Sequence, residues 1–153
     1  MGVRVLDSVL RTLRGASSLT ESLGLAPVEL AVIETDGALE LADSLKTAYD
    51  GAPATGMSVQ TNSLDEMATH PGVVARQLGL DGLCGTCRAC PVVRSCGGGL
   101  YAHRYRTENG EGWFTNPSVF CTDLKHLLTG NPAREDQKMP EPHHPLTDVH
   151  PAE

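Results

Sequence analysis

The sequence predicts a small α+β protein, and three observations support this class. The chain has 153 residues, which is the size of one ordinary domain. An Asp36-Gly37 pair separates two alternating segments, as in a β-hairpin. Several other segments combine helical periodicity with helix start and stop signals, and each of them is short.

Residues 1–25 predict a helical lead-in to the domain. Four apolar residues at i, i+3, i+4 and i+7 form one stripe of a helix that ends near Gly15, and they are Leu6, Val9, Leu10 and Leu13. The motif SLTE at residues 18–21 has the pattern of a capping box. It predicts a second short helix, which Gly24 would end.

Residues 26–130 are the predicted folded domain, and they begin with the hairpin at residues 28–41. Residues 50–56 read DGAPATG and predict a turn and loop. The motif SLDE at residues 63–66 is a second capping box, and the helix it starts is broken at His70-Pro71. Pro71 suits the first turn of a further helix that runs to about Leu78.

The remaining segments are a cysteine-rich stretch, a last helix and a tail. The cysteine-rich stretch predicts an irregular, glycine-rich chain. Cys121 begins the last short helix, with Thr122 as the candidate cap. Residues 131–153 carry five prolines in 23 residues and predict a disordered tail. The tail holds three histidines, but we expect no metal role for them because nothing fixes their geometry; they are His143, His144 and His150.

Composition excludes several classes of function. The chain has no run of about 18 apolar residues, so we expect no membrane span. Its N-terminus lacks the apolar region of a secretory signal, so we expect a cytoplasmic location. A net charge of −7 with few aromatic residues argues against a nucleic-acid partner.

The cysteines are the strongest functional signal in the sequence. Four of the five lie within residues 84–96, and their spacing is C-x2-C-x2-C-x5-C-x24-C; they are Cys84, Cys87, Cys90, Cys96 and Cys121. In a reducing cytosol such clusters are more often metal ligands than disulfides. An odd number of cysteines also fits four ligands and one spare thiol. The spacing therefore predicts a thiolate-bound metal centre.

Four thiolates suit either zinc or an iron–sulfur cluster. Three features favour the cluster. The motif CGGG at residues 96–99 would let backbone N–H groups approach a large cluster. The segment between Asp81 and Glu108 has no acidic residue, and its arginines either offset an anionic centre or are simply solvated; they are Arg88, Arg94, Arg104 and Arg106. The second compact C-x2-C knuckle of a zinc ribbon is missing.

The motifs CRACPVVRSCGGGLYAHRYR and NPSVFCTDL resemble the SPASM region of radical SAM/SPASM peptide maturases, closest to the cyclophane-forming maturases of FxSxx-type systems. The resemblance covers roughly residues 3–128. It implies one auxiliary [4Fe–4S] cluster in a small SPASM-like domain, with the ligands Cys87, Cys90, Cys96 and Cys121. The family's next cysteine would fall on Leu100 and the hairpin holds none, so a second cluster is not expected. Cys84 lies outside this set, as a spare thiol or an alternative ligand.

The chain departs from the family in one large respect, since it has no C-x3-C-x2-C motif. We therefore expect no S-adenosylmethionine site and no radical SAM activity from this chain alone. The resemblance implies an accessory or truncated part of a maturase, which relays electrons or positions a peptide. Its partners would be a separate radical SAM barrel protein and a ribosomal precursor peptide. Two alternatives stay open: a zinc-stabilised binding protein without a redox role, and a non-functional remnant.

Overall fold

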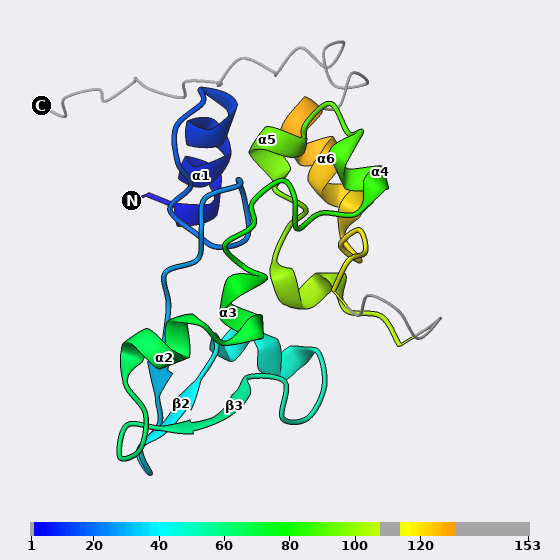
Figure 1. The fold of residues 1–153 in the computed structure, drawn as a ribbon. Helices are drawn as coiled ribbons and strands as arrows, with labels where there is room; N and C mark the ends of the chain where they lie inside the picture. The colour runs from blue at the N-terminus through cyan, green and yellow to red at the C-terminus, as the bar shows by residue number, and fades with distance from the viewer. Residues whose placement is uncertain (1, 108–113, 131–153) are drawn as a thin grey trace, which may run out of the picture.

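The computed structural model describes residues 2–107 and 114–130 of the chain. It confirms a small α+β fold, with a three-stranded antiparallel sheet and several short helices. Figure 1 shows two halves: the sheet lies in one half with α2 and α3, and the other half contains α1, α4, α5 and α6. No helix within the described residues is long and apolar enough to cross a membrane.

The sheet is small and meandering. Its strands are β1 (Val32–Ile33), β2 (Ala38–Glu40) and β3 (Ala54–Ser58), and β2 lies in the middle. Both pairings are antiparallel, as expected when short loops join neighbouring strands. Leu39 on β2 is 1% exposed and anchors the main core from the sheet.

The predicted hairpin turn is present between β1 and β2. The amide of Gly37 donates to the carbonyl of Glu34 at 2.9 Å, and Gly37 has a φ of 88°. The carboxylate of Asp36 accepts from the amide of Ala38 at 2.9 Å. Asp and Gly are favoured here because one side chain bonds the local backbone and the other residue tolerates positive φ. The paired part is shorter than the predicted span of 28–41, since β1 has only two residues.

The prediction of a loop at residues 50–56 is wrong in its second half, where β3 begins. The hydroxyl of Thr55 donates to the carbonyl of Leu39, and the amide of Met57 donates to the same hydroxyl at 3.1 Å. The register shifts between Leu39 and Glu40 at this point, which is the pattern of a bulge. This strand consists of small residues, a glycine and one methionine, which give no alternating apolar pattern. The sequence therefore does not predict β3.

The helices of the sheet half start as the sequence predicts. Ser63 caps α2 (Leu64–Ala68): the amide of Glu66 donates to its hydroxyl at 3.2 Å, and its own amide donates to Glu66 at 2.7 Å. Pro71 occupies the first turn of α3 (Pro71–Val74). This helix ends well before the predicted residue Leu78, because the chain turns away after Ala75.

One hydrophobic core holds the sheet half together. It joins side chains of β2, the 3-10 helix η1 (Asp43–Thr47), α2 and the 3-10 helix η2 (Tyr101–Arg104). Its buried members are Leu39, Leu41, Leu45, Ala52, Met67 and Ala102. Because η2 follows the cysteine-rich stretch directly, this core ties the cysteines to the sheet.

The predicted N-terminal helix is α1 (Arg4–Leu13), but its apolar stripe does not face the protein. Of the stripe, Val9 is buried, whereas Leu6, Leu10 and Leu13 are each about half exposed at 50%, 51% and 50%. The small polar residues Ser8 and Thr12 are buried beside Val9 instead. The buried hydroxyl of Ser8 has a hydrogen-bond partner, because it accepts from the amide of Leu19 at 3.0 Å.

The predicted helix at residues 18–24 is wrong, because these residues form turns. The hydroxyl of Ser18 accepts from the amide of Thr20 at 3.0 Å rather than from the third residue of a helix. The carboxylate of Glu21, which would complete the capping box, instead binds the guanidinium of Arg76 at 2.6 Å. The ion pair with Arg76 thus removes the carboxylate that the capping box at residues 18–21 needs.

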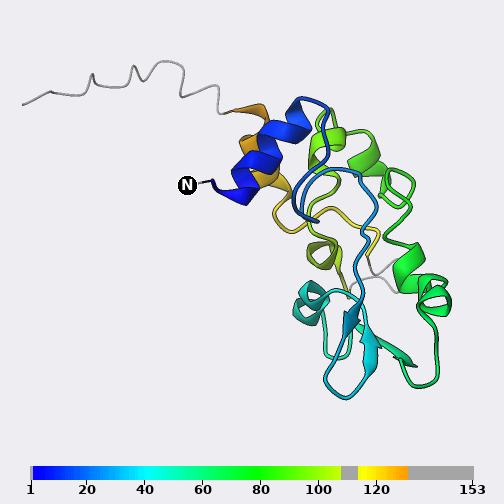
Figure 2. The same cartoon turned by 90° about the vertical axis from the view of Figure 1, so that its left-hand side faces the viewer.

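The chain at residues 20–28, which we call the lead segment, joins the two halves (Figure 2). The amide of Gly24 donates to the carbonyl of Ser95 at 2.9 Å in the cysteine half. The amide of Val28 donates to the carbonyl of Arg76 at 3.4 Å, and Gln77 donates back to Val28 at 2.7 Å, beside the sheet half. The lead segment therefore contacts both halves through its backbone.

Candidate metal centre

The cysteine-rich stretch is more regular than the sequence predicts. It folds into two single-turn helices, α4 (Gly85–Arg88) and α5 (Val93–Cys96), instead of an irregular chain. Cys84 stands just before α4, and Cys87 lies within it. The amide of Cys90 donates to the carbonyl of Cys87 at 3.0 Å, which turns the chain tightly between these two cysteines. Such a turn lets a C-x2-C pair aim both sulfurs at one point.

Cys121 is brought to this stretch by the last helix. It is the first residue of α6 (Cys121–Thr129), which packs against α5. The cap residue is Phe120 rather than Thr122, and no side chain caps this helix. The amide of Cys121 donates to the carbonyl of Ser118 at 3.0 Å, so a turn and not a cap sets the start of the helix.

The four predicted ligands line one pocket between α4, α5 and α6, and they are Cys87, Cys90, Cys96 and Cys121. The pocket contains about 380 Å³ of space, part of it open to solvent. Cys84 is not among its lining residues, although its thiol is hydrogen-bonded to that of Cys87. Cys84 therefore lies next to Cys87 but outside the lining of this pocket.

The spacing of the sulfurs bears on which centre fits the pocket. The described residues include all five cysteines, yet no three of the sulfurs lie within 4.8 Å of one another. A zinc ion bound to four thiolates would hold them about 3.8 Å apart, as follows from a Zn–S bond of about 2.3 Å. A four-iron cluster separates its cysteines further, because each sulfur binds a different iron. The number and type of donors suit either centre.

Three consecutive glycines shape the wall of the pocket beside Cys96. Gly97, Gly98 and Gly99 have φ angles of 61°, 80° and 71°, which disfavour any other residue. The amide of Gly99 donates to the carbonyl of Cys96 at 3.0 Å, and the amides of Gly98 and Gly99 lie beside the Cys96 thiol. A Cβ on Gly99 would lie 2.8 Å from the side chain of Leu124, so this loop is also pressed against α6. The loop thus places backbone N–H groups beside the thiol of Cys96.

The thiols of Cys87 and Cys96 favour their neutral form when no metal is bound. Burial, with the hydrogen bond to Cys84 and the charges of Cys121 and Cys96, raises the pKa of Cys87 to about 12. Burial also raises the pKa of Cys96, while the amides of Gly98 and Gly99 lower it. Because metals bind thiolates, occupation of this pocket must release protons.

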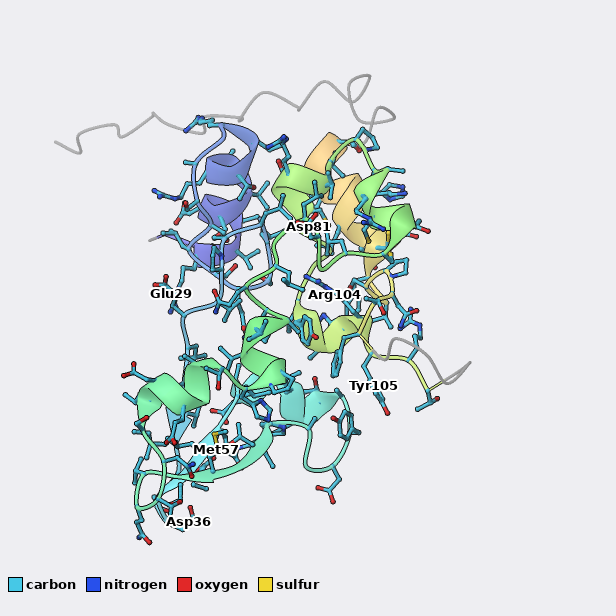
Figure 3. The ribbon with its side chains drawn as sticks, viewed as in Figure 1. Glu29, Asp36, Met57, Asp81, Arg104 and Tyr105 are labelled. Carbon is cyan, nitrogen blue, oxygen red and sulfur yellow. The ribbon has the colours of Figure 1, made fainter. Side chains whose placement is uncertain are left out.

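Arg104 binds the glycine loop through its side chain and lies where the two halves meet (Figure 3). Its guanidinium Nη2 donates to the carbonyls of Gly97 at 2.7 Å and of Gly99 at 3.0 Å. Burial lowers the pKa of Arg104, and thiolate charge at Cys87 and Cys96 raises it. Among the predicted offsetting arginines, this one is partly buried and coupled to the thiols, whereas Arg88 and Arg94 are exposed.

The sequence reasoning did not single out two further residues of the pocket. Lys125 lies one helical turn after Cys121, and Ser118 precedes α6; both line the pocket. The i, i+4 spacing of Cys121 and Lys125 was the available signal, because such residues share one helix face. The ammonium of Lys125 places a positive charge beside the thiols.

A second group of potential metal ligands lies on the sheet half, and it consists of Glu34, Glu40 and Asp43. The ammonium of Lys46 already occupies it, at 2.9 Å from both Glu34 and Asp43 and 3.7 Å from Glu40. Hydrogen bonds to Asp43 and Glu34 raise the pKa of Lys46. We interpret this group as an ion-pair cluster and not as a metal site. The three histidines of the tail lie outside the described residues.

Comparison of the chain with protein-family models, with curated proteins and with solved structures found no significant match. The site is therefore interpreted from its own geometry. The resemblance of its cysteine blocks to SPASM domains stays a prediction.

Proposed function

We propose that this chain binds one [4Fe–4S] cluster through Cys87, Cys90, Cys96 and Cys121 and acts as an accessory SPASM-type module of a peptide-modifying system. One observation carries the proposal: four cysteines from two distant stretches of sequence line a single pocket. In a random arrangement, Cys121 would have no reason to face cysteines that lie 25 and more residues before it.

Three features of the pocket support a cluster over zinc. The sulfurs are spread more widely than a tetrahedral zinc site requires. Two backbone amides lie beside the thiol of Cys96, and N–H donors to the ligand sulfurs tune cluster potentials. A partly buried arginine and a lysine lie near the thiols, where they offset negative charge. Together these features suit a large anionic centre.

The chain's own residues would hold the centre and shield it. Cys96 is fixed by the glycine loop, and Cys121 is fixed by the packing of α6 on α5. Because four protein sulfurs complete the ligation, the chemistry supplied by a bound cluster is one-electron transfer and not activation of a substrate. The role of the protein is then to set the potential of an electron relay or to position a peptide beside it.

The partners follow from what the sequence lacks. Without a C-x3-C-x2-C motif, the chain needs a separate radical SAM barrel protein for the radical chemistry. A ribosomal precursor peptide would be the substrate of that pair, in the cytoplasm. The function proposed for this chain is therefore accessory.

Metal analysis of the chain, purified without oxygen, tests the proposal. We expect about four irons and four sulfides per chain, with a broad visible absorbance that oxygen bleaches. A colourless, folded protein with one zinc and no iron would replace the proposal with a zinc-stabilised binding protein. A chain that stays unfolded with either metal supplied would identify a remnant.

A further inference from the structure

A second pocket lies where the two halves meet, on the other side of the glycine loop from the cysteines. It contains about 420 Å³ of space, part of it open to solvent. Its polar lining comes from four side chains in three separate parts of the chain, and they are Glu21, Arg76, Tyr101 and Arg104. Neither the cysteine motifs nor the proposed function uses this pocket.

Arg76 is the most buried charged group in this pocket. Its side chain is 2% exposed, and its Nη2 donates to the carboxylate of Glu21 at 2.6 Å. Its Nε is buried as well and has no hydrogen-bond partner in the part of the chain that the structure describes. A buried N–H without a partner is destabilising, because nothing replaces the hydrogen bond that it makes to water in the unfolded chain. A hydrogen-bond acceptor placed in the pocket beside the Nε of Arg76 would remove this cost.

Arg104 lines the same pocket and has the same combination of a bonded Nη2 and an unpartnered Nε. Its Nη2 is committed to the carbonyls of Gly97 and Gly99, as described above. Its Nε is buried and lacks a partner among the described residues. The guanidinium also lies over the ring of Tyr101, 5.4 Å from the ring centre. Two guanidinium groups thus face a pocket whose lining holds a single carboxylate.

We propose that this pocket binds a small oxyanion, either a carboxylate or a phosphate, which accepts hydrogen bonds from the Nε groups of Arg76 and Arg104. Guanidinium groups match both oxyanions because their N–H donors fit paired oxygens. The net charge of the lining side chains is positive, since two arginines outnumber Glu21. Three aliphatic side chains of the lead segment form part of the remaining wall and limit the size of the ligand, and these are Leu25, Ala26 and Val28.

Tyr101 supplies a third donor to the same pocket. Burial raises the pKa of Tyr101, although the positive charges of Arg104 and Arg76 lower it. The hydroxyl therefore stays protonated near neutral pH and can donate to an anion. The inference does not depend on the proposed function, because no cysteine takes part in the pocket.

Calorimetric titration of the full chain tests the inference, with sodium acetate and inorganic phosphate added separately at constant ionic strength. We expect saturable binding of at least one of them. Arg76→Lys and Arg104→Lys keep the charge but remove the Nε donor, so each should weaken binding about tenfold or more. Tyr101→Phe should weaken it less. Arg4→Met, which removes an exposed arginine of α1, should bind as the original chain does.

A second titration distinguishes the two sources of the oxyanion. It uses short peptides that carry a free or an amidated C-terminus. Binding of the free acid alone identifies a peptide carboxylate, and binding of phosphate alone identifies a phosphate group. Far-UV circular dichroism verifies that each variant is folded. The inference is overturned by the absence of saturable binding in the original chain, or by folded Arg76→Lys and Arg104→Lys variants that bind with unchanged affinity.

Discussion

Gly97 lies directly against the backbone of Gly24, so closely that a Cβ on Gly97 would stand 1.6 Å from the carbonyl oxygen of Gly24. The Gly97→Ala substitution would force these two segments apart and would also place alanine at a φ of 61°. We expect a loss of at least about 2 kcal/mol in the free energy of unfolding, from overpacking and backbone strain. Denaturant unfolding followed by circular dichroism measures it.

Gly85→Ala is the matched control for this prediction. Gly85 lies in α4 of the same cysteine stretch, and no atom lies within 4 Å of a Cβ placed there. Alanine also has the higher helix propensity, so this variant should be as stable as the original chain or slightly more stable. Equal losses in both variants would contradict the close contact of Gly97 and Gly24.

The separation of Cys84 from the pocket gives a second prediction. Cys121→Ser should lose most of the bound iron and the visible absorbance, because it removes the ligand that α6 supplies. Cys84→Ser should retain both, since Cys84 does not line the pocket. Iron and sulfide content per folded chain is the measurement. If Cys84→Ser loses the centre and Cys121→Ser keeps it, the ligand set is wrong.

Alkaline pH provides a third prediction through Tyr101. Its pKa is raised in the folded chain by burial, so the unfolded chain releases this proton first, near pH 10. The stability contributed by neutral Tyr101 is therefore complete below about pH 10 and is lost as pH rises through the folded pKa. Spectrophotometric titration of the tyrosines should show a late component that Tyr101→Phe removes. A titration of Tyr101→Phe with its late component intact would refute the assignment.

The core of the sheet half gives a fourth prediction. Leu39→Ala removes a side chain that is 1% exposed, and should cost about 2–5 kcal/mol of unfolding free energy. Leu10→Ala removes the same atoms from a side chain that is 51% exposed on α1, and should cost much less. Thermal unfolding of both variants compares them. Similar losses would mean that the exposed face of α1 is covered in solution.

Local signals in the sequence predicted the parts of the fold that local chemistry decides. Ser63 and Glu66 bond each other's backbone whatever surrounds them, and the Asp36-Gly37 turn forms from its own residues. The same reasoning failed at residues 18–24, where Arg76 lies 55 residues away from the glutamate that it binds. Contacts between residues so far apart in the chain produce no periodic pattern in the sequence.

The cysteine site was predictable because its motif is dense. Cysteine spacing and the CGGG run pointed to the ligands and to the N–H donors beside Cys96, and the structure brings these groups together. The second pocket was not predictable, since no local motif links Arg76 to Arg104 and only the folded chain brings both to one pocket. The buried face of α1 was missed because small hydroxyl residues, Ser8 and Thr12, take the inner positions.

The lead segment also determines whether the two halves unfold together. It is hydrogen-bonded to Ser95 on one side and to Arg76 on the other, so neither half can open without detaching it. We expect amide hydrogens of β2 and α6 to exchange with solvent at the same free-energy cost, as a single cooperative unit. One proteolytic cut near Ala26 should abolish that coupling and let the two halves melt independently.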